Sequence, residues 1–222
     1  MLNKRGGFYA IVLGFIVLAT VASMVGSRAG QGANAGLRIA AVDRTRLITD
    51  YKYTKDTDLA LQKQQADAEL RLRTWAQNAL LTEGDQSRLS DLLLEEQTAG
   101  ANFDAGKKAE MKKLQQKSAD EGNEFTNLQG NQNPNPAQQM RLGVLTRAFS
   151  ETQTRVESAR KTITVDLQKK DQESQAKIIR DMREAIAQVA KAKGFSLVLP
   201  TDIAYFSDND ITDAVLATMN KK

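Results

Sequence analysis

The chain has 222 residues, a formal net charge of +4 at pH 7, and no cysteine or histidine. The absence of both residue types excludes disulfide scaffolds, zinc sites of the usual ligand types, and catalysis by a Cys nucleophile or a His base. Aromatic residues make up only 5% of the chain, which favours an extended helical protein over a globule with a large core.

Residues 1–36 carry an export signal. Lys4 and Arg5 precede an uncharged, mostly apolar run from Gly6 to Ser27, as in a secretory signal peptide or an N-terminal membrane anchor. Because positive charges stay on the cytoplasmic side, we expect the rest of the chain to be exported. The sequence is consistent with cleavage of this segment and with its retention as a tether to the inner membrane.

The two ends of the chain hold the strand signals. "LRIAAVD" (37–43) contains a short apolar run that stops at Asp43, and "GFSLVLP" (194–200) contains another, bounded by Gly194 and Pro200. Asp208 and Asp210 form a polar break before a last amphipathic segment, where they suit helix capping better than a cation site. We therefore expect a small β-containing base from residues 37–54 and 194–222, with strands at 39–42, 196–199 and 203–206 and a helix at 211–219.

The middle of the chain, residues 55–193, is polar and helix-forming. From Ala137 to Lys193 there is no proline. Apolar residues recur there in steps of three and four, which predicts a coiled-coil seam: Leu142, Leu145, Phe149, Thr152, Val156, Ala159 and Ile163. The outgoing half is longer and is interrupted at 82–85, where Asp85 is a candidate helix cap, and at 98–106.

"GNQNPNP" (130–136) is the strongest break in this middle region. Its prolines disfavour helix in the residues before them, and its Asn and Gly residues favour turns. A linker between two domains would leave both sets of strands unpaired. The sequence therefore predicts a mainly α fold: a long antiparallel coiled-coil-like helical hairpin with its tip at 130–136, on a small β-containing base formed by both chain ends.

Two segments carry a family resemblance. "RIAAVDRTRLITDY" (38–51) reads as a strand followed by a short helix, and "AIAQVAKAKGFSLVLPTDIAYFSDNDITDAVLATMNKK" (185–222) reads as a helix end, two strands, an Asp-x-Thr turn and a final helix. Both are similar to the ends of the Skp (OmpH-like) family of periplasmic chaperones. The arm between them resembles the family in composition alone, and it is longer than is usual there.

The resemblance implies a homotrimer with three helical arms around a cavity. It also implies an ATP-independent periplasmic holdase, without cofactor or enzymatic activity, that keeps unfolded outer-membrane or exported proteins from aggregating. The base would supply the oligomerisation contacts, for which the candidates are Ile39, Val42, Leu197, Leu199, Ile203, Tyr205 and Val215.

Sparse apolar side chains on the arm are the candidates for client contact: Leu114, Phe125, Leu128, Leu142 and Phe149. The alternative is that they only form the seam between two helices.

Charge on the outgoing arm is segregated. Residues 82–104 hold six acidic residues and one basic residue, and a lysine-rich segment follows. Its lysines would attract acidic clients or anionic lipid surfaces, or they would simply solvate one helix face: Lys107, Lys108, Lys112, Lys113 and Lys117. No basic motif interleaved with aromatic residues is present, so we expect no nucleic-acid partner.

The competing function is that of a membrane-anchored coiled-coil spacer, such as a stator stalk. A stalk of that kind needs neither the strand signals at 197–199 and 203–206 nor a turn in the middle of the chain.

Overall fold

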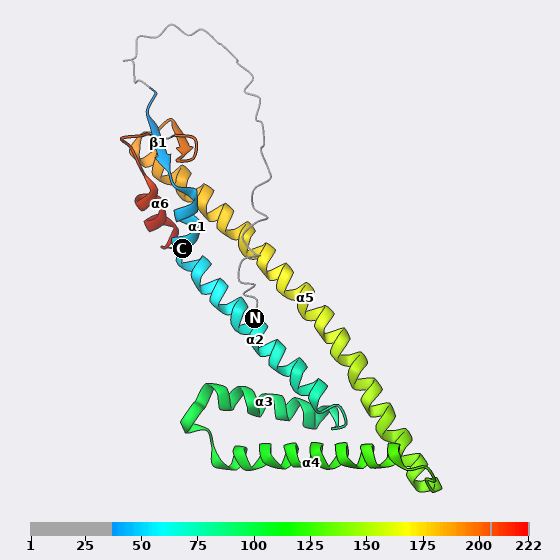
Figure 1. Ribbon diagram of the computed structural model, residues 1–222. Coiled ribbons are helices and arrows are strands. Elements are labelled where there is room, and N and C mark those ends of the chain that lie inside the picture. The colour runs from blue at the N-terminus through cyan, green and yellow to red at the C-terminus, as the bar shows by residue number, and fades with distance from the viewer. Residues whose placement is uncertain (1–36, 205, 222) are drawn as a thin grey trace, which may run out of the picture. The chain divides into compact units, whose positions relative to one another are not determined.

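The computed structural model describes residues 37–204 and 206–221 (Figure 1). Residues 1–36, where the sequence predicts an export signal, and Tyr205, a predicted base residue, lie outside these residues. In chain order the elements are β1 (Ile39–Val42), α1 (Arg44–Asp50), α2 (Lys52–Gln77), α3 (Glu83–Ala99), η1 (Gly100–Asn102), α4 (Ala105–Gly130), α5 (Pro136–Lys193), β2 (Leu197–Pro200) and α6 (Thr212–Met219).

The two ends of the described chain meet in a two-stranded parallel sheet. β1 pairs with β2 in a register that sets Ile39 opposite Leu197 and Val42 opposite Pro200. On its other edge β1 makes one further bridge, between Ala41 and Asp210. The predicted fold class, mainly α with a small β-containing base, is confirmed.

The third strand expected at 203–206 is wrong for its described residues. The N–H groups of Ile203 and Ala204 both donate to the Pro200 carbonyl at 3.0 Å, which forms a turn there. The backbone that flanks β1 comes later, since Ala41 donates to the Asn209 carbonyl at 2.9 Å and accepts from the Ile211 N–H at 3.0 Å. Apolar side chains at 203–206 suggested a strand there. The bridge to β1 instead uses main-chain atoms of the polar segment around Asp210.

A buried cluster fixes the sheet to three helices. Ala40, Leu47, Ala185 and Val215 are all 0% exposed, and they come from β1, α1, α5 and α6 respectively. Burial of such side chains contributes roughly 25 cal/mol per Å² of apolar surface removed from water. This cluster is the core of the base.

α5 is a single helix of 58 residues, about 87 Å long at 1.5 Å per residue. Its start is well specified: Asn135 and Gln138 form a capping box, and Pro136 occupies the first helical turn. Its end is specified by Gly194, whose φ of 71° is the left-handed conformation that glycine adopts readily. No proline interrupts it in between, so the helix runs the length of the arm.

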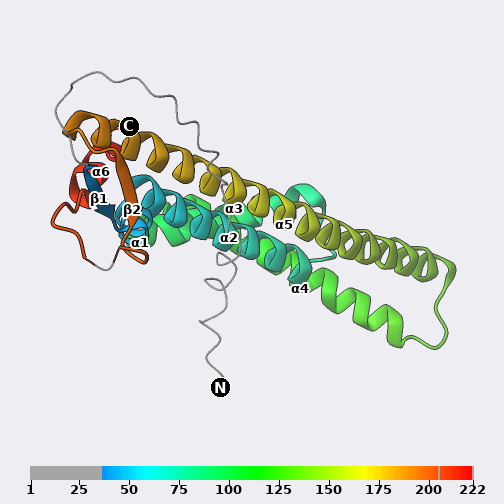
Figure 2. The same ribbon diagram turned by 90° about the horizontal axis from the view of Figure 1, so that it is seen from above.

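α2 lies antiparallel beside the part of α5 nearest the base (Figures 1 and 2). Tyr51, just before α2, hydrogen-bonds to Asp181, and the Ala79 carbonyl, just after α2, accepts from Thr152 at 3.0 Å. From Thr152 to the tip, α2 therefore gives α5 no support.

The outgoing chain reverses direction twice before it reaches the tip. α3 folds back against α2, tied by an Arg71–Asp91 ion pair at 2.8 Å, and α4 then runs antiparallel to α3 (Figure 1). Thr82 caps α3 by accepting from the Asp85 N–H at 3.2 Å, so Asp85 lies in the first turn and is not the cap that the sequence suggested. The interruptions at 82–85 and 98–106 lie at these two reversals.

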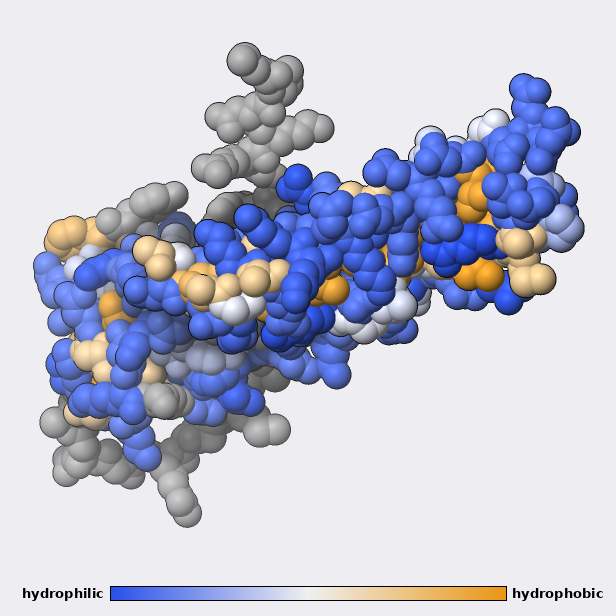
Figure 3. Space-filling model, turned by 90° about the horizontal axis from the view of Figure 1, so that it is seen from below, coloured by the Kyte–Doolittle hydropathy of each residue, from blue (hydrophilic) through white to orange (hydrophobic). Residues whose placement is uncertain are grey.

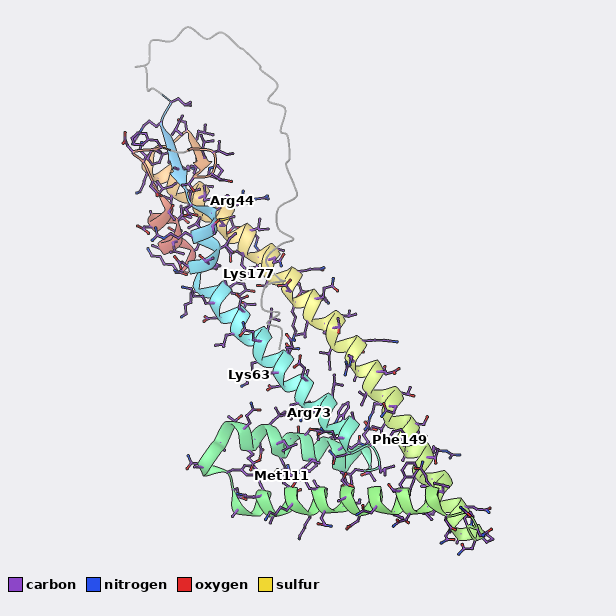
Figure 4. The ribbon with its side chains drawn as sticks, viewed as in Figure 1. Arg44, Lys63, Arg73, Met111, Phe149 and Lys177 are labelled. Carbon is purple, nitrogen blue, oxygen red and sulfur yellow. The ribbon has the colours of Figure 1, made fainter. Side chains whose placement is uncertain are left out.

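A second buried cluster holds the α3–α4 pair together. Leu81, Leu89, Leu92 and Met111 are buried, and half-buried Leu114 packs against them. Figure 4 shows Met111 on α4 on the side that faces α3. Residues 81–114 thus have a core of their own, separate from that of the base.

We predict that Leu92→Ala opens the α3–α4 pair while the base stays intact. Leu92 is 0% exposed, so its truncation leaves a cavity that costs about 2–5 kcal/mol. Hydrogen exchange should accelerate at amides of α3 and the first half of α4 and stay unchanged in β1 and α6. Leu59→Ala, at a position 69% exposed, is the matched control. Equal loss of protection in the base would show that the two cores are not separate.

Candidate functional site

Of the apolar residues predicted at the distal arm, Phe125 and Phe149 contact each other. The rings of Phe125 on α4 and Phe149 on α5 stack with centroids 6.2 Å apart, and on the same two helices Leu128 is buried and Leu142 is half-buried. Leu145 is also buried there, and a bidentate Arg141–Glu124 ion pair crosses the same two helices. These residues form the α4–α5 seam, and Leu114 lies apart from it in the α3–α4 cluster.

Three large apolar side chains of the distal arm stay exposed. Met140 is 74% exposed, Val144 is 54% exposed and Phe149 is 41% exposed. Met140 and Val144 are one helical turn apart on α5 and lie away from the seam. Their i, i+4 spacing outside the seam phase was the sequence signal for them. Figure 3 shows apolar residues on the visible face as separate patches within a hydrophilic surface.

The segregated charges pair α3 with α4. Lys107 contacts Glu95 at 2.8 Å and Lys117 contacts Asp85 at 2.6 Å. Arg88 makes a bidentate pair with Glu110 at 2.8 and 2.6 Å. Among the described residues, the exposed lysines of this segment that make no ion pair are Lys108, Lys112 and Lys113.

These ion pairs shift the titration of their members. The hydrogen bond from Lys117 lowers the pKa of the Asp85 carboxyl, and the same bond raises the pKa of Lys117. The bidentate bond from Arg88 lowers the pKa of Glu110 in the same way. Each pair therefore favours the charged forms in the folded state.

The residues predicted for the oligomerisation base divide into two groups. Val42 and Val215 are buried in the core of the base and line no surface, and Leu199 is half-buried. Ile39, Leu197 and Ile203 are exposed, together with Leu37 and the 84% exposed Phe206, which the sequence reasoning did not single out. These five exposed residues are called the base surface below: Leu37, Ile39, Leu197, Ile203 and Phe206.

A buried polar cluster joins the arm to the base. The Tyr51 hydroxyl donates to Asp181 at 2.9 Å, and Lys177, one turn before Asp181 on α5, pairs with the same carboxylate. The Lys177 ammonium also lies over the Tyr53 ring, 4.4 Å from its centroid. Burial and the contact with Asp181 raise the pKa of Tyr51. Only a structure reveals this cluster, because its members are 130 residues apart.

A second polar cluster joins the α2–α3 reversal to α5. Gln86 is fully buried and donates to the carbonyls of Asn78 at 2.9 Å and Leu81 at 3.0 Å. Its carbonyl oxygen accepts from Arg155, which also pairs with Glu83 at 3.1 Å. The reversal is thereby anchored at one point on the long helix.

The described residues contain no group of acidic side chains suited to hold a metal ion. Asp210 is engaged locally, since its carboxylate accepts from the Thr212 N–H at 2.8 Å and from the Thr212 hydroxyl at 2.6 Å. The hydroxyl bond is the main reason that the pKa of Asp210 is lowered. Across the described part of the chain, every helix is too short or too polar to cross a bilayer. The N-terminal apolar run lies outside that part.

Comparison with known proteins gives one match. A family model described as outer membrane protein (OmpH-like) matches residues 38–219, which is more than half of the chain and includes both strands of the base and the whole arm. No curated protein and no solved structure matches the chain significantly.

We predict that the Asp85–Lys117 pair stabilises the α3–α4 contact only above mildly acidic pH. The folded pKa of Asp85 lies below its unfolded value of about 3.9, so the contribution is complete above about pH 5 and is lost as pH falls through the folded pKa. A carbon-13 NMR titration of the Asp85 carboxyl should show a depressed pKa that Lys117→Ala returns toward the unfolded value. Lys113→Ala, which removes a lysine without an ion pair, should leave it unchanged. A depressed pKa that persists in Lys117→Ala would contradict the assignment.

Proposed function

The chain belongs to the OmpH-like family, and from that premise we propose that it is an ATP-independent holdase of the periplasm. The family is one of periplasmic chaperones, which bind outer-membrane proteins and are not enzymes. In the proposed function, the protein takes up unfolded outer-membrane or exported proteins between helical arms and prevents their aggregation. The family match over residues 38–219 carries the proposal.

The arm has the physical properties that such a function requires. A holdase needs weak, distributed attraction for many sequences, and separately exposed apolar side chains supply it without a fixed pocket. We assign distal client contact to Met140, Val144 and Phe149, which are exposed. Leu114, Phe125, Leu128 and Leu142 pack within the chain, and they support client contact only by holding α3, α4 and α5 in place.

Only some lysines of the lysine-rich segment are available to attract a partner by their charge. Lys107 and Lys117 are engaged with acids of α3. The proposal therefore rests on Lys108, Lys112 and Lys113, whose charges lie on the surface of α4 and would draw in acidic clients or anionic lipids. Such attraction weakens as salt is added, because the Debye length falls.

The base surface supports a homotrimer. A two-stranded sheet is marginally stable by itself, and five of the eleven exposed large apolar side chains of the described chain belong to the base surface. Association of three copies through this surface would cover those side chains and set three arms around a cavity.

The stator-like spacer is the less favoured alternative. A spacer extends away from its anchor, whereas here β1 pairs with β2 and α5 returns the chain to the base. Retention of residues 1–36 as a tether remains compatible with the holdase function, because the arm and the base both begin after them.

We predict that the purified protein suppresses aggregation of a urea-unfolded outer-membrane β-barrel protein on dilution, measured by light scattering without ATP. Met140→Ser combined with Val144→Ser should weaken suppression several-fold, because both side chains are proposed client contacts. Val165→Ser, on the same helix and 62% exposed, is the matched control. Absence of suppression by the unmodified protein would refute the holdase function.

The same aggregation assay tests whether the unpaired lysines of α4 attract clients electrostatically. Reversal of Lys108, Lys112 and Lys113 to Glu should remove most of the salt dependence of suppression. Unchanged salt dependence would eliminate the electrostatic proposal while leaving the holdase function standing.

We predict that light scattering coupled to size exclusion gives a particle of three chains. Leu197→Arg should convert it to a monomer that keeps its helical circular dichroism, since a charge on the base surface opposes burial there. Leu59→Arg, at an exposed site on α2, should leave the trimer intact. A monomeric unmodified protein would overturn the assembly.

A further inference from the structure

Polar side chains attach the α2–α3 reversal, residues 78–86, to α5. Gln86 donates to the Thr152 hydroxyl at 3.3 Å, and that hydroxyl donates to the Ala79 carbonyl at 3.0 Å. Arg155 donates to the side-chain oxygen of Gln86 and pairs with Glu83 at 3.1 Å. Hydrogen bonds and an ion pair therefore link the reversal to the long helix.

The two hydrophobic clusters of the described residues lie on either side of this attachment. The α5 members of the base cluster fall within Ile178–Val189, and the α3–α4 cluster around Leu92 has no member from α5. Between the base and the reversal, α2 residues from Ala60 to Trp75 line a groove of about 460 Å³ beside α5. Exposed Lys170 of α5 donates to Gln64 of this stretch at 2.7 Å. The distance between α2 and α5 here therefore depends on how firmly the reversal is attached.

Arg155 contacts both helices that meet at the reversal. Its guanidinium lies 4.9 Å from the centroid of the Trp75 ring, in the last turn of α2. The same guanidinium donates to Gln86 and pairs with Glu83, both in the first turn of α3. A single side chain of α5 thus connects to the end of one helix and to the start of the next.

The attachment leaves two of its own hydrogen-bond donors unsatisfied. Trp75 Nε1 and Arg155 Nε are buried, and neither has an acceptor among the described residues. A buried donor without a partner forgoes the hydrogen bond that it would make with water, which destabilises the state that buries it. Separation of Arg155 from the reversal would hydrate both donors. The cost of the lost contacts is therefore partly offset when the attachment opens.

We propose that this attachment is a releasable clasp, formed by Trp75, Glu83, Gln86, Thr152 and Arg155. Its opening separates the distal half of α2 from α5, while the base, the α3–α4 pair and the α5 helix stay folded. A minor state of this kind is typically populated at about 0.1–10%. The inference is independent of the proposed holdase function, because it rests only on contacts within the chain.

The chain carries its own probe of the clasp, since Trp75 is its only tryptophan. Selective nitrogen-15 labelling of tryptophan in the full chain gives one indole N–H resonance, whose exchange with solvent reports each opening. Amide exchange of the peptides that contain Leu92 and Ala185 reports the two hydrophobic clusters. We expect the indole to be many-fold less protected than these amides, once each rate is corrected for its intrinsic exchange, because the clasp opens without unfolding either cluster.

Two arginines of α5 provide a matched pair of variants. Arg155→Ala removes the ion pair, the hydrogen bond to Gln86 and the contact with the Trp75 ring, so we expect indole protection to fall roughly tenfold or more. Arg160→Ala, at an exposed position on the same helix, should leave it nearly unchanged. Glu83→Gln is the milder second variant, because it weakens only the exposed ion pair, and it should lower protection by a smaller factor.

A distance measurement separates opening of the clasp from simple uncovering of the indole. The chain has no cysteine, so spin labels can be placed at will. Ala76→Cys with Ser158→Cys labels exposed sites on α2 and α5 near the clasp, and Asp56→Cys with Ala176→Cys labels exposed sites near the base. Labelled chains are diluted with unlabelled chains, so that pulsed electron paramagnetic resonance reports distances within one chain. In Arg155→Ala we expect a longer second distance for the distal pair and an unchanged distance for the pair near the base.

The clasp is supported only if both measurements agree. Indole protection as high as that of the Ala185 amide would overturn it, and so would equal effects of Arg155→Ala and Arg160→Ala. A single, unchanged distal distance in Arg155→Ala would show that the indole was merely uncovered, which also overturns the clasp. Equal lengthening near the base would show that α2 leaves α5 as a whole, and no local clasp would then exist. If Arg155→Ala does not fold, the same readouts apply to Glu83→Gln.

Discussion

The pairing of β1 with β2 is the constraint from which the rest of the structure follows. Two four-residue strands that lie more than 150 residues apart form a parallel pair, so the chain between them must travel out and return. Helix is the economical path because it satisfies its own backbone hydrogen bonds without a large core. The shared core of Leu47, Ala185 and Val215 then fixes both ends of that path to the sheet.

The outgoing and returning halves differ in length, and the α3–α4 pair takes up the difference. The surplus folds into an antiparallel pair with its own core around Leu92, and ion pairs between α3 and α4 flank that core. Gln86 and Arg155 secure the start of this pair to α5. The segregated charges of the sequence are thereby explained first as internal contacts, and only the lysines that remain unpaired are available for partners.

Local signals in the sequence were sufficient for the fold class and for the position of most helices. Asn135 with Pro136 and Gly194 are explicit start and stop signals, and the seam around Leu145 has helical spacing. The meeting of the two chain ends was also predictable, but most contacts between particular distant residues were not. The sequence does not reveal that Asn209–Ile211 would flank β1, that Asp181 would meet Tyr51, or that Phe125 would stack on Phe149. Such contacts depend on how the helices pack against each other. A single sequence has no local signal that identifies which distant residues come into contact.

The double reversal has a mechanical consequence for the arm. Between Thr152 and the tip, α5 no longer lies beside α2 and instead contacts the last part of α4, through Phe125–Phe149 and Arg141–Glu124. The partner of the distal third of α5 thus continues into α3, whereas the partner of its proximal part, α2, continues into the base. We therefore expect bending of the arm to concentrate beyond Thr152, away from the contacts of the base.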